Sequence, residues 1–164
     1  MWICDTHSDT LFAMGVEKNA SPAITPARLR QGGVTLQTFA LWSGRQGNKG
    51  DVKGIMDAEM SMVPTMLAAG MKQVDDPTEA KEGESSFMLS IEGAEIFEGG
   101  LHTVAEWREK GVRMVALLWN NENKLGQSAK SGSTQGLTDY GVQVVKEMQR
   151  LHMAVATSHL NEAG

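Results

Sequence analysis

The chain has 164 residues, of which 41% are hydrophobic and 21% charged, and these proportions predict one globular domain over residues 1–164 with a sizeable core. Its formal net charge of −5 comes from interspersed charges, which exclude the basic surface expected of a nucleic-acid-binding protein or a membrane-surface binder. Small-molecule chemistry is the better expectation for this composition. The single cysteine, Cys4, cannot form an internal disulfide, and its place in an apolar run predicts burial in a strand.

No stretch of the sequence approaches 18 uninterrupted apolar residues, so we expect no membrane segment. The first four residues run directly into Asp5, without the basic and apolar segments of a secretory signal. The sequence as written therefore predicts a cytoplasmic protein. A leader missing from an incomplete sequence would reverse that expectation.

Apolar runs typical of strands lie at about residues 2–5, 33–41, 86–91, 112–118 and 153–158. Segments with helical periodicity lie between several of these runs. This alternation predicts an α/β fold made of βα units with a parallel sheet.

Two helices are expected from their apolar periodicity. The first spans Ile55–Ala69, and its methionines are typical of core filling rather than of a cofactor surface. The second begins at Thr138, where Val142, Val145 and Met148 fall on one apolar face.

Four metal-competent side chains follow predicted strands. His7 and Asp9 come after the first strand, Glu92 ends the third and His159 ends the fifth. Residues two apart in a strand point to the same side, so His7 and Asp9 would converge on one point. Because α/β folds place their sites at strand ends, these four residues are candidate metal ligands. Each also suits a plain scaffolding role, such as a hydrogen-bonded turn.

The two other histidines are expected to be structural. His102 lies early in the predicted helix that includes Trp107, and His152 lies at a helix end, where an imidazolium is favoured electrostatically.

A longer series of short motifs contains these residues, and its order and spacing are more specific than any one motif. The series comprises Asp5–Leu11, Gly32–Val34 with Gln37, Ser90–Gly93, Gly111–Arg113, Trp119–Asn120 with Asn123, Gly136–Thr138, Gly141 with Val144–Met148, and Ser158–His159. It resembles the zinc dipeptidases of the renal, or membrane, dipeptidase type, within the amidohydrolase-like metal-dependent hydrolases.

The resemblance implies a (β/α)8 TIM-like barrel of the metal-dependent hydrolase type, present here as an N-terminal partial barrel of about five strands. It also implies that His7 and Asp9 hold one zinc ion, that Glu92 bridges two zinc ions, and that His159 holds the second. A metal-bridging hydroxide would then hydrolyse a dipeptide or similar small amide, with Glu92 as the catalytic carboxylate. Two nearby dications need a shared anion and lower the pKa of a bridging water, which agrees with this assignment. Imidazole and carboxylate ligands suit catalytic zinc.

The sequence departs from this family at the position of Trp119, where mammalian members carry a substrate-binding histidine. An indole has one donor and no acceptor, so Trp119 would give the substrate an apolar wall while Asn120 or Asn123 supplies polar contacts. Plain packing of Trp119 in the core is the alternative.

The length is the second departure, because barrels of this kind typically need about 250 residues. The family's later ligand histidine, its substrate-binding arginine and its aspartate would lie beyond Gly164. A sheet edge left open after five strands would favour self-association or a complementary C-terminal half.

Two other readings remain open at the level of sequence. One is a non-catalytic partial-barrel subunit or remnant that retains part of a metal site. The other is an unrelated open α/β domain. The sequence does not support it, because it contains neither a G-x-G-x-x-G motif after the first strand nor a phosphate-binding P-loop.

Overall fold

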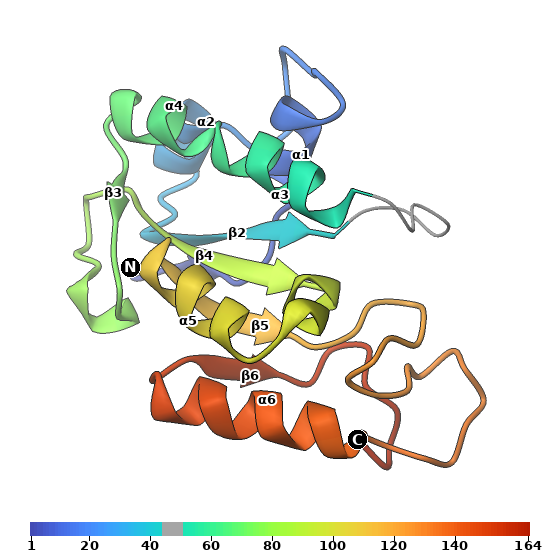
Figure 1. Ribbon diagram of the computed structural model, residues 1–164. Helices are drawn as coiled ribbons and strands as arrows, with labels where there is room; N and C mark the ends of the chain where they lie inside the picture. The colour runs from blue at the N-terminus through green and yellow to red at the C-terminus, as the bar shows by residue number, and fades with distance from the viewer. Residues whose placement is uncertain (44–50) are drawn as a thin grey trace. The chain divides into compact units, whose positions relative to one another are not determined.

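The computed structural model describes residues 1–43 and 51–164 and contains two compact units (Figure 1). The first unit comprises Met1–Trp42 and Gly54–Ser90, and the second comprises Ser43–Lys53 and Ile91–Gly164. The boundary falls within strand β4 (Ser86–Glu92), which therefore contributes residues to both units. The expectation of a single domain over residues 1–164 stays a prediction.

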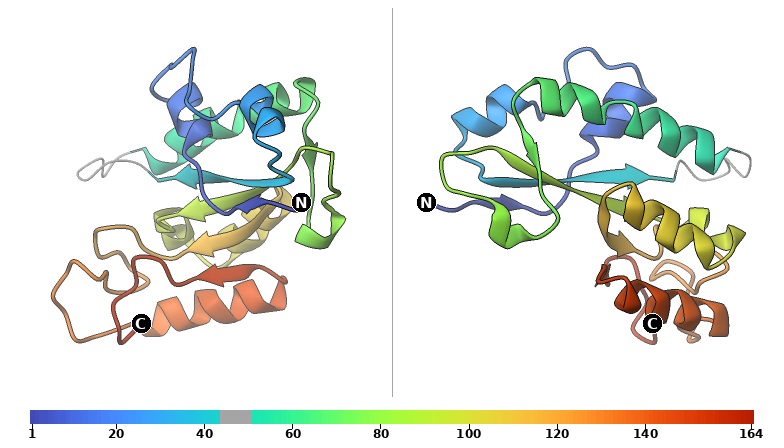
Figure 2. Two further views of the ribbon diagram at one scale, coloured as in Figure 1. Left: turned by 180° about the vertical axis from the view of Figure 1, so that it is seen from behind. Right: turned by 60° about the vertical axis from the view of Figure 1, so that its left-hand side comes forward.

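The first unit contains parallel strands in the hydrogen-bonded order β1 (Cys4–Asp5), β2 (Leu36–Trp42) and β4, with β3 (Lys72–Gln73) on the side of β4. Its helices lie along one side of β2 in both figures (Figures 1 and 2). They are α1 (Thr10–Gly15), α2 (Pro26–Gln31), α3 (Val52–Met60) and α4 (Val63–Ala68), and a short 3-10 helix, η1 (Pro77–Glu79), follows β3.

Strand β2 is the centre of the first unit's core. Its first six residues, 36–41, are all buried, as expected of a parallel strand that is covered on both faces. Phe39 of β2 packs on Phe87 of β4, with ring centroids 5.6 Å apart. The buried residues of this segment include the polar Gln37 and Thr38, so the burial of β2 is continuous although its sequence is not entirely apolar.

The second unit contains the end of β4, followed in the hydrogen-bonded order by β5 (Val112–Ala116) and β6 (Ala154–Ala156). Strands β5 and β6 are parallel, with Met114 opposite Ala154. A 3-10 helix, η2 (Glu95–Gly99), and two helices, α5 (His102–Glu109) and α6 (Asp139–Arg150), complete this unit. Helix α6 runs beside β6 in Figure 1. The core of the second unit includes Val104, Trp107, Val112, Val115, Val144 and Met148.

All five strand-like runs of the sequence contain a strand, and the sheet is parallel, so both expectations are confirmed. Strand β3 was not predicted, because two residues are too short to show a periodicity. The single helix expected over Ile55–Ala69 is wrong: α3 ends at Met60 and α4 begins at Val63. The physical reason is Pro64, which has no N–H for an i−4 bond and suits the first turn of a new helix.

Two burial expectations are also corrected. Cys4 is exposed, because β1 is a two-residue strand at the end of the strand order and pairs only with β2 among the described strands. Helix α6 does begin after its N-cap Thr138, but Val142 is 40% exposed. The buried residues of α6 are instead Gly141, Val144 and Met148.

Within the described ranges, none of the helices has the length and apolar character required to cross a membrane.

Candidate functional site

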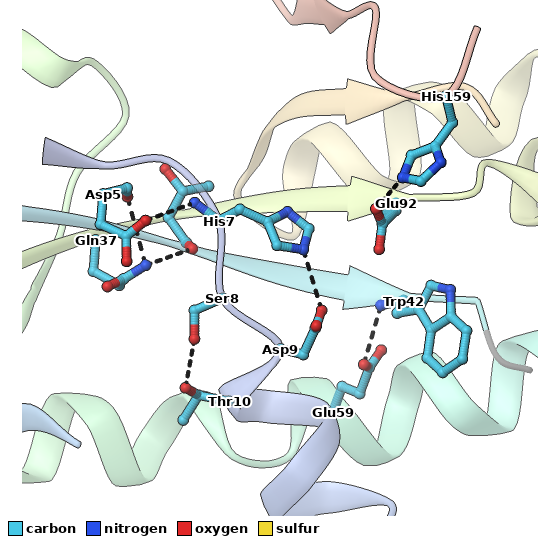
Figure 3. A network of polar contacts seen from close by, with 11 residues as sticks. Asp5, His7, Ser8, Asp9, Thr10, Gln37, Trp42, Glu59, Glu92 and His159 are labelled. Atoms are coloured by element: carbon cyan, nitrogen blue, oxygen red, sulfur yellow. Dashed lines mark hydrogen bonds and ion pairs between the residues drawn. The ribbon is translucent and has the colours of Figure 1, made fainter. Parts of the chain in front are cut away.

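His7 and Asp9 lie in the segment that joins β1 to α1, and Figure 3 shows them side by side. His7 Nε2 is 3.3 Å from Asp9 Oδ1, and about half of each side chain is exposed. The expected convergence is therefore confirmed, although β1 ends at Asp5 and both residues lie beyond it. Asp9 is the N-cap residue of α1, yet its carboxylate accepts no capping hydrogen bond within this fully described helix. The Asp9 carboxylate is therefore not engaged in capping the N-terminus of α1.

The residues that alternate with this pair anchor the segment to the core. Ser8 and Thr10 are buried, and their hydroxyl oxygens are 2.7 Å apart. The Ser8 carbonyl accepts a hydrogen bond from the Ala40 N–H of β2 at 2.9 Å. An inward Ser8 and Thr10 leave His7 and Asp9 on the accessible side, which is the alternation that a strand would also have produced.

The second histidine–carboxylate pair lies in the second unit. Glu92 ends β4, His159 follows β6, and His159 Nε2 is 3.0 Å from Glu92 Oε1 (Figure 3). The Glu92 side chain is 13% exposed and the His159 side chain is 31% exposed, so this pair is more enclosed than His7 and Asp9. His159 has φ 65°, and its carbonyl accepts the Ala129 N–H at 2.8 Å.

Gly93 follows Glu92 for a steric reason. Its φ is +79°, and a Cβ at this position would lie 2.7 Å from Ser43 Oγ and 2.8 Å from Glu95 Oε2. Those two atoms are hydrogen-bonded to each other at 2.5 Å, with the Ser43 hydroxyl donating. The Ser43 N–H also donates to the Glu92 carbonyl at 3.3 Å. Only glycine allows this network to close against the backbone beside Glu92.

The three residues expected to contact substrate occupy different local settings. Trp119 is half-buried, with its ring centroid 6.5 Å from that of His159 and the planes tilted by 51°. The Asn120 carbonyl accepts the Ser128 hydroxyl at 2.8 Å. Asn123 uses its amide within the scaffold, because Nδ2 donates to the Leu117 carbonyl at 2.8 Å and Oδ1 accepts the Leu125 N–H at 2.9 Å. Their substrate-binding roles stay predictions.

A residue that the sequence analysis overlooked is Glu59, which is fully buried in the first unit. Its Oε1 accepts the Trp42 N–H at 3.0 Å, and Oε2 has no hydrogen-bond partner among the described residues (Figure 3). The pKa of Glu59 is raised to about 8: burial is the main cause, the hydrogen bond from the Trp42 N–H lowers the pKa in part, and the charge of Asp9 contributes to the rise. The available signal was its position three residues after Met56 on an otherwise apolar helix face.

The donor atoms of both pairs fit a zinc ion. Each pair offers one imidazole nitrogen and carboxylate oxygens, without a thiolate, and such sets suit catalytic rather than structural zinc. The uncommitted capping position of Asp9 and the exposure of its partner His7 make the first pair accessible to an ion. His102, by contrast, lies in α5 as expected, 3.9 Å from Glu106 on the exposed surface.

Parallel βα units with histidine–carboxylate pairs after the strands define an α/β protein built like part of a TIM barrel. The sequence matches the family described as membrane dipeptidase (peptidase family M19) over residues 1–164. The chain therefore belongs to the membrane dipeptidase family.

Solved structures have the same fold. The crystal structure of the dipeptidase AC, a metallo peptidase of family M19, has a TM-score of 0.82 and 20% sequence identity to this chain, and the match covers 100% of this chain and 59% of the dipeptidase AC chain. A second match is the crystal structure of a metallo peptidase from Rhodobacter sphaeroides, liganded with a phosphinate mimic of the dipeptide L-Ala-D-Ala. It has a TM-score of 0.81 and 19% sequence identity to this chain, and the match covers 100% of this chain and 60% of the Rhodobacter sphaeroides chain. The expected partial barrel is thereby confirmed as the fold.

Among curated proteins, an uncharacterised dipeptidase of Schizosaccharomyces pombe is 30% identical over 83 residues, which is 48% of this chain and 20% of that protein. An uncharacterised protein of Klebsiella pneumoniae is 33% identical over 83 residues, 47% of this chain and 31% of its own length. The chain thus spans about three fifths of the matched crystal structures, and the matched segments are a smaller part of the curated relatives.

Proposed function

We propose that this chain takes part in zinc-dependent hydrolysis of dipeptides or similar small amides, with His7, Asp9, Glu92 and His159 as the metal ligands. The observation that carries the proposal is the pairing of each histidine with a carboxylate after a strand, at 3.3 Å and 3.0 Å, in a member of the membrane dipeptidase family. Two zinc ions are proposed for the complete enzyme.

In this proposal His7 and Asp9 would hold one ion, His159 would hold the other, and Glu92 would be shared between them. Zinc, when bound, lowers the pKa of a coordinated water and polarises a carbonyl oxygen. The protein supplies the negative charge of Asp9 and Glu92, which offsets the repulsion between two dications. Gly93 and the Ser43–Glu95 hydrogen bond fix the backbone from which the Glu92 side chain extends.

A dipeptide is the proposed substrate class because the Rhodobacter sphaeroides relative was solved with a phosphinate mimic of a dipeptide. Trp119, whose ring lies near that of His159, is proposed as an apolar wall for the substrate. Asn120 and Asn123 are proposed as its polar contacts. A complementary C-terminal half, self-association and a cytoplasmic location stay predictions.

The test is a zinc titration of the 164-residue chain by calorimetry, with metal content measured independently. We expect wild type to bind zinc, and Asp9→Asn and Glu92→Gln to weaken binding at least ~10-fold, because each removes a ligand charge. The matched control is His102→Asn, an exposed histidine of α5 outside both pairs, which should bind like wild type. Unchanged zinc affinity in Asp9→Asn and Glu92→Gln would refute the ligand assignment.

Dipeptide hydrolysis is measured on the same samples. For this chain alone we expect weak or single-ion binding and little hydrolysis, and activity when residues equivalent to the rest of the barrel are supplied as a second chain. Zinc binding without hydrolysis in both conditions would favour the alternative function, a non-catalytic partial-barrel subunit.

A further inference from the structure

Glu59 lies where three elements of the first unit meet: α3, the end of β2 and α1. It belongs to α3, and its carboxyl group accepts the backbone N–H of Trp42, the last residue of β2. Full burial of a glutamate is rare and needs a compensating interaction. The Trp42 hydrogen bond compensates Oε1 but not Oε2.

Helix α1 packs against α3 directly at this point. A Cβ on Gly15 of α1 would lie 2.4 Å from the Ala58 carbonyl oxygen and 3.1 Å from Glu59 Cα, so the two backbones approach as closely as glycine permits. On the other side, the ring of Phe12 in α1 packs edge-on against Trp42, with centroids 4.9 Å apart. Glu59 therefore connects the strand end and the helix through both its backbone and its side chain.

Helix α1 carries Asp9 at its N-terminus, where the Asp9 carbonyl accepts the Ala13 N–H at 2.9 Å. A shift of α1 against β2 would thus move the Asp9 carboxylate relative to His7. The charge of Asp9 is one of the causes that raise the pKa of Glu59, which places the two carboxyl groups within electrostatic reach of each other.

We propose that Glu59 is a positioning residue for Asp9, which holds the short helix α1 in place by binding the Trp42 N–H and by packing α3 against Gly15, the last residue of α1. This inference rests on the proposed function, because Asp9 matters as a metal ligand. Loss of a residue that orients a metal ligand typically lowers metal affinity by about 10- to 100-fold.

The experiment compares three substitutions in the full chain. Glu59→Gln keeps an acceptor for Trp42 at nearly the same size, Glu59→Asp withdraws the carboxyl by one methylene, and Glu59→Leu removes it. Met56→Ala is the matched control, since Met56 is fully buried one turn earlier on α3 and truncation there loosens packing without removing the Trp42 contact.

Zinc titration gives the first readout. We expect at least ~10-fold weaker zinc binding in Glu59→Leu and Glu59→Asp, and binding within ~3-fold of wild type in Glu59→Gln. Met56→Ala should lower the melting temperature while retaining zinc affinity. A merely structural Glu59 would instead give zinc affinities that follow the melting temperature in all four variants.

Amide hydrogen exchange without metal gives the second readout. The Ala13 N–H reports the start of α1, and we expect it to exchange at least ~10-fold faster in Glu59→Leu or Glu59→Asp but not in Glu59→Gln. If Glu59→Asp, or Glu59→Leu where it folds, matches wild type in both readouts, the positioning role is refuted. A wild type that binds no zinc refutes the proposed function, and the exchange rates then still decide the role of Glu59.

Discussion

Replacing Glu59 with glutamine should abolish a large pH dependence of stability. Burial raises the pKa of Glu59 to about 8 in the folded chain, against an ordinary value of 4.5. The folded state therefore holds the proton more tightly than the unfolded state. Below pH 4.5 the carboxyl is protonated in both states, and its stabilising contribution is fully present. Between pH 4.5 and 8 only the unfolded chain loses the proton, so the free energy of unfolding falls as pH rises.

The magnitude follows from the gap of about 3.5 pKa units at about 1.4 kcal/mol each, which gives on the order of 5 kcal/mol over the whole window. Because Glu59 is fully buried, solvent does not screen this contribution. Glutamine has the same shape and does not ionise, so Glu59→Gln lacks this dependence. The stability of Glu59→Gln relative to wild type should therefore rise by about 3 kcal/mol between pH 5 and pH 7.5.

The assay is urea unfolding of both proteins at half-unit pH intervals, with a chelator present and tryptophan fluorescence as the signal. The quantity of interest is the difference between the two free energies of unfolding at each pH, since other titrating groups cancel in that difference. A difference that stays constant from pH 5 to 8 would refute the reasoning, because it would mean that Glu59 ionises alike in both states.

Three further substitutions test local features of the second unit. Gly93→Ala forces a Cβ to within 2.7 Å of Ser43 Oγ at a positive φ, and should lower the free energy of unfolding by about 2 kcal/mol; a loss below half of that would contradict the steric account. Thr138→Ala removes the N-cap hydrogen bond of α6 and should cost about 1 kcal/mol in the same assay, whereas no loss would show that the cap is dispensable. His102→Asn changes an exposed side chain and should alter stability by less than about 0.5 kcal/mol; a larger change would reveal an unrecognised structural contact.

Helix α6 shows how far the sequence determines the fold. The start of α6 can be predicted from the sequence because Thr138 is a good N-cap residue, and in the structure Thr138 Oγ1 accepts the Gly141 N–H. Its buried face was misplaced because Gly141 packs against a distant segment, where a Cβ would lie 1.9 Å from the Leu125 carbonyl oxygen. That approach buries the glycine and leaves Val142 exposed, and hydrophobic periodicity carries no information about it.

In the candidate site, too, features set by local sequence were predictable, whereas features set by distant segments could not be predicted from local sequence alone. The pairing of His7 with Asp9 is local, so the spacing of two residues was enough to predict it. The approach of His159 to Glu92 spans 67 residues and was inferred from the parallel βα pattern and the family resemblance. The burial of Glu59 depends on Trp42 and α1, which lie elsewhere in the chain, so a reading of α3 alone could not reveal it.

Backbone strain at His159 indicates that its side chain makes a contact that a glycine could not make. Among the residues that the structure describes, Lys18, His152 and His159 are the non-glycine residues with positive φ, and His152 follows the C-cap of α6, where a left-handed residue is ordinary. His159 follows a strand and a turn, and its φ of 65° costs on the order of 1 kcal/mol that glycine would avoid. Its carbonyl bond from Ala129 would form equally with glycine, since it involves only the backbone. The contact that glycine could not make is the 3.0 Å bond to Glu92, and this contact therefore offsets the strain.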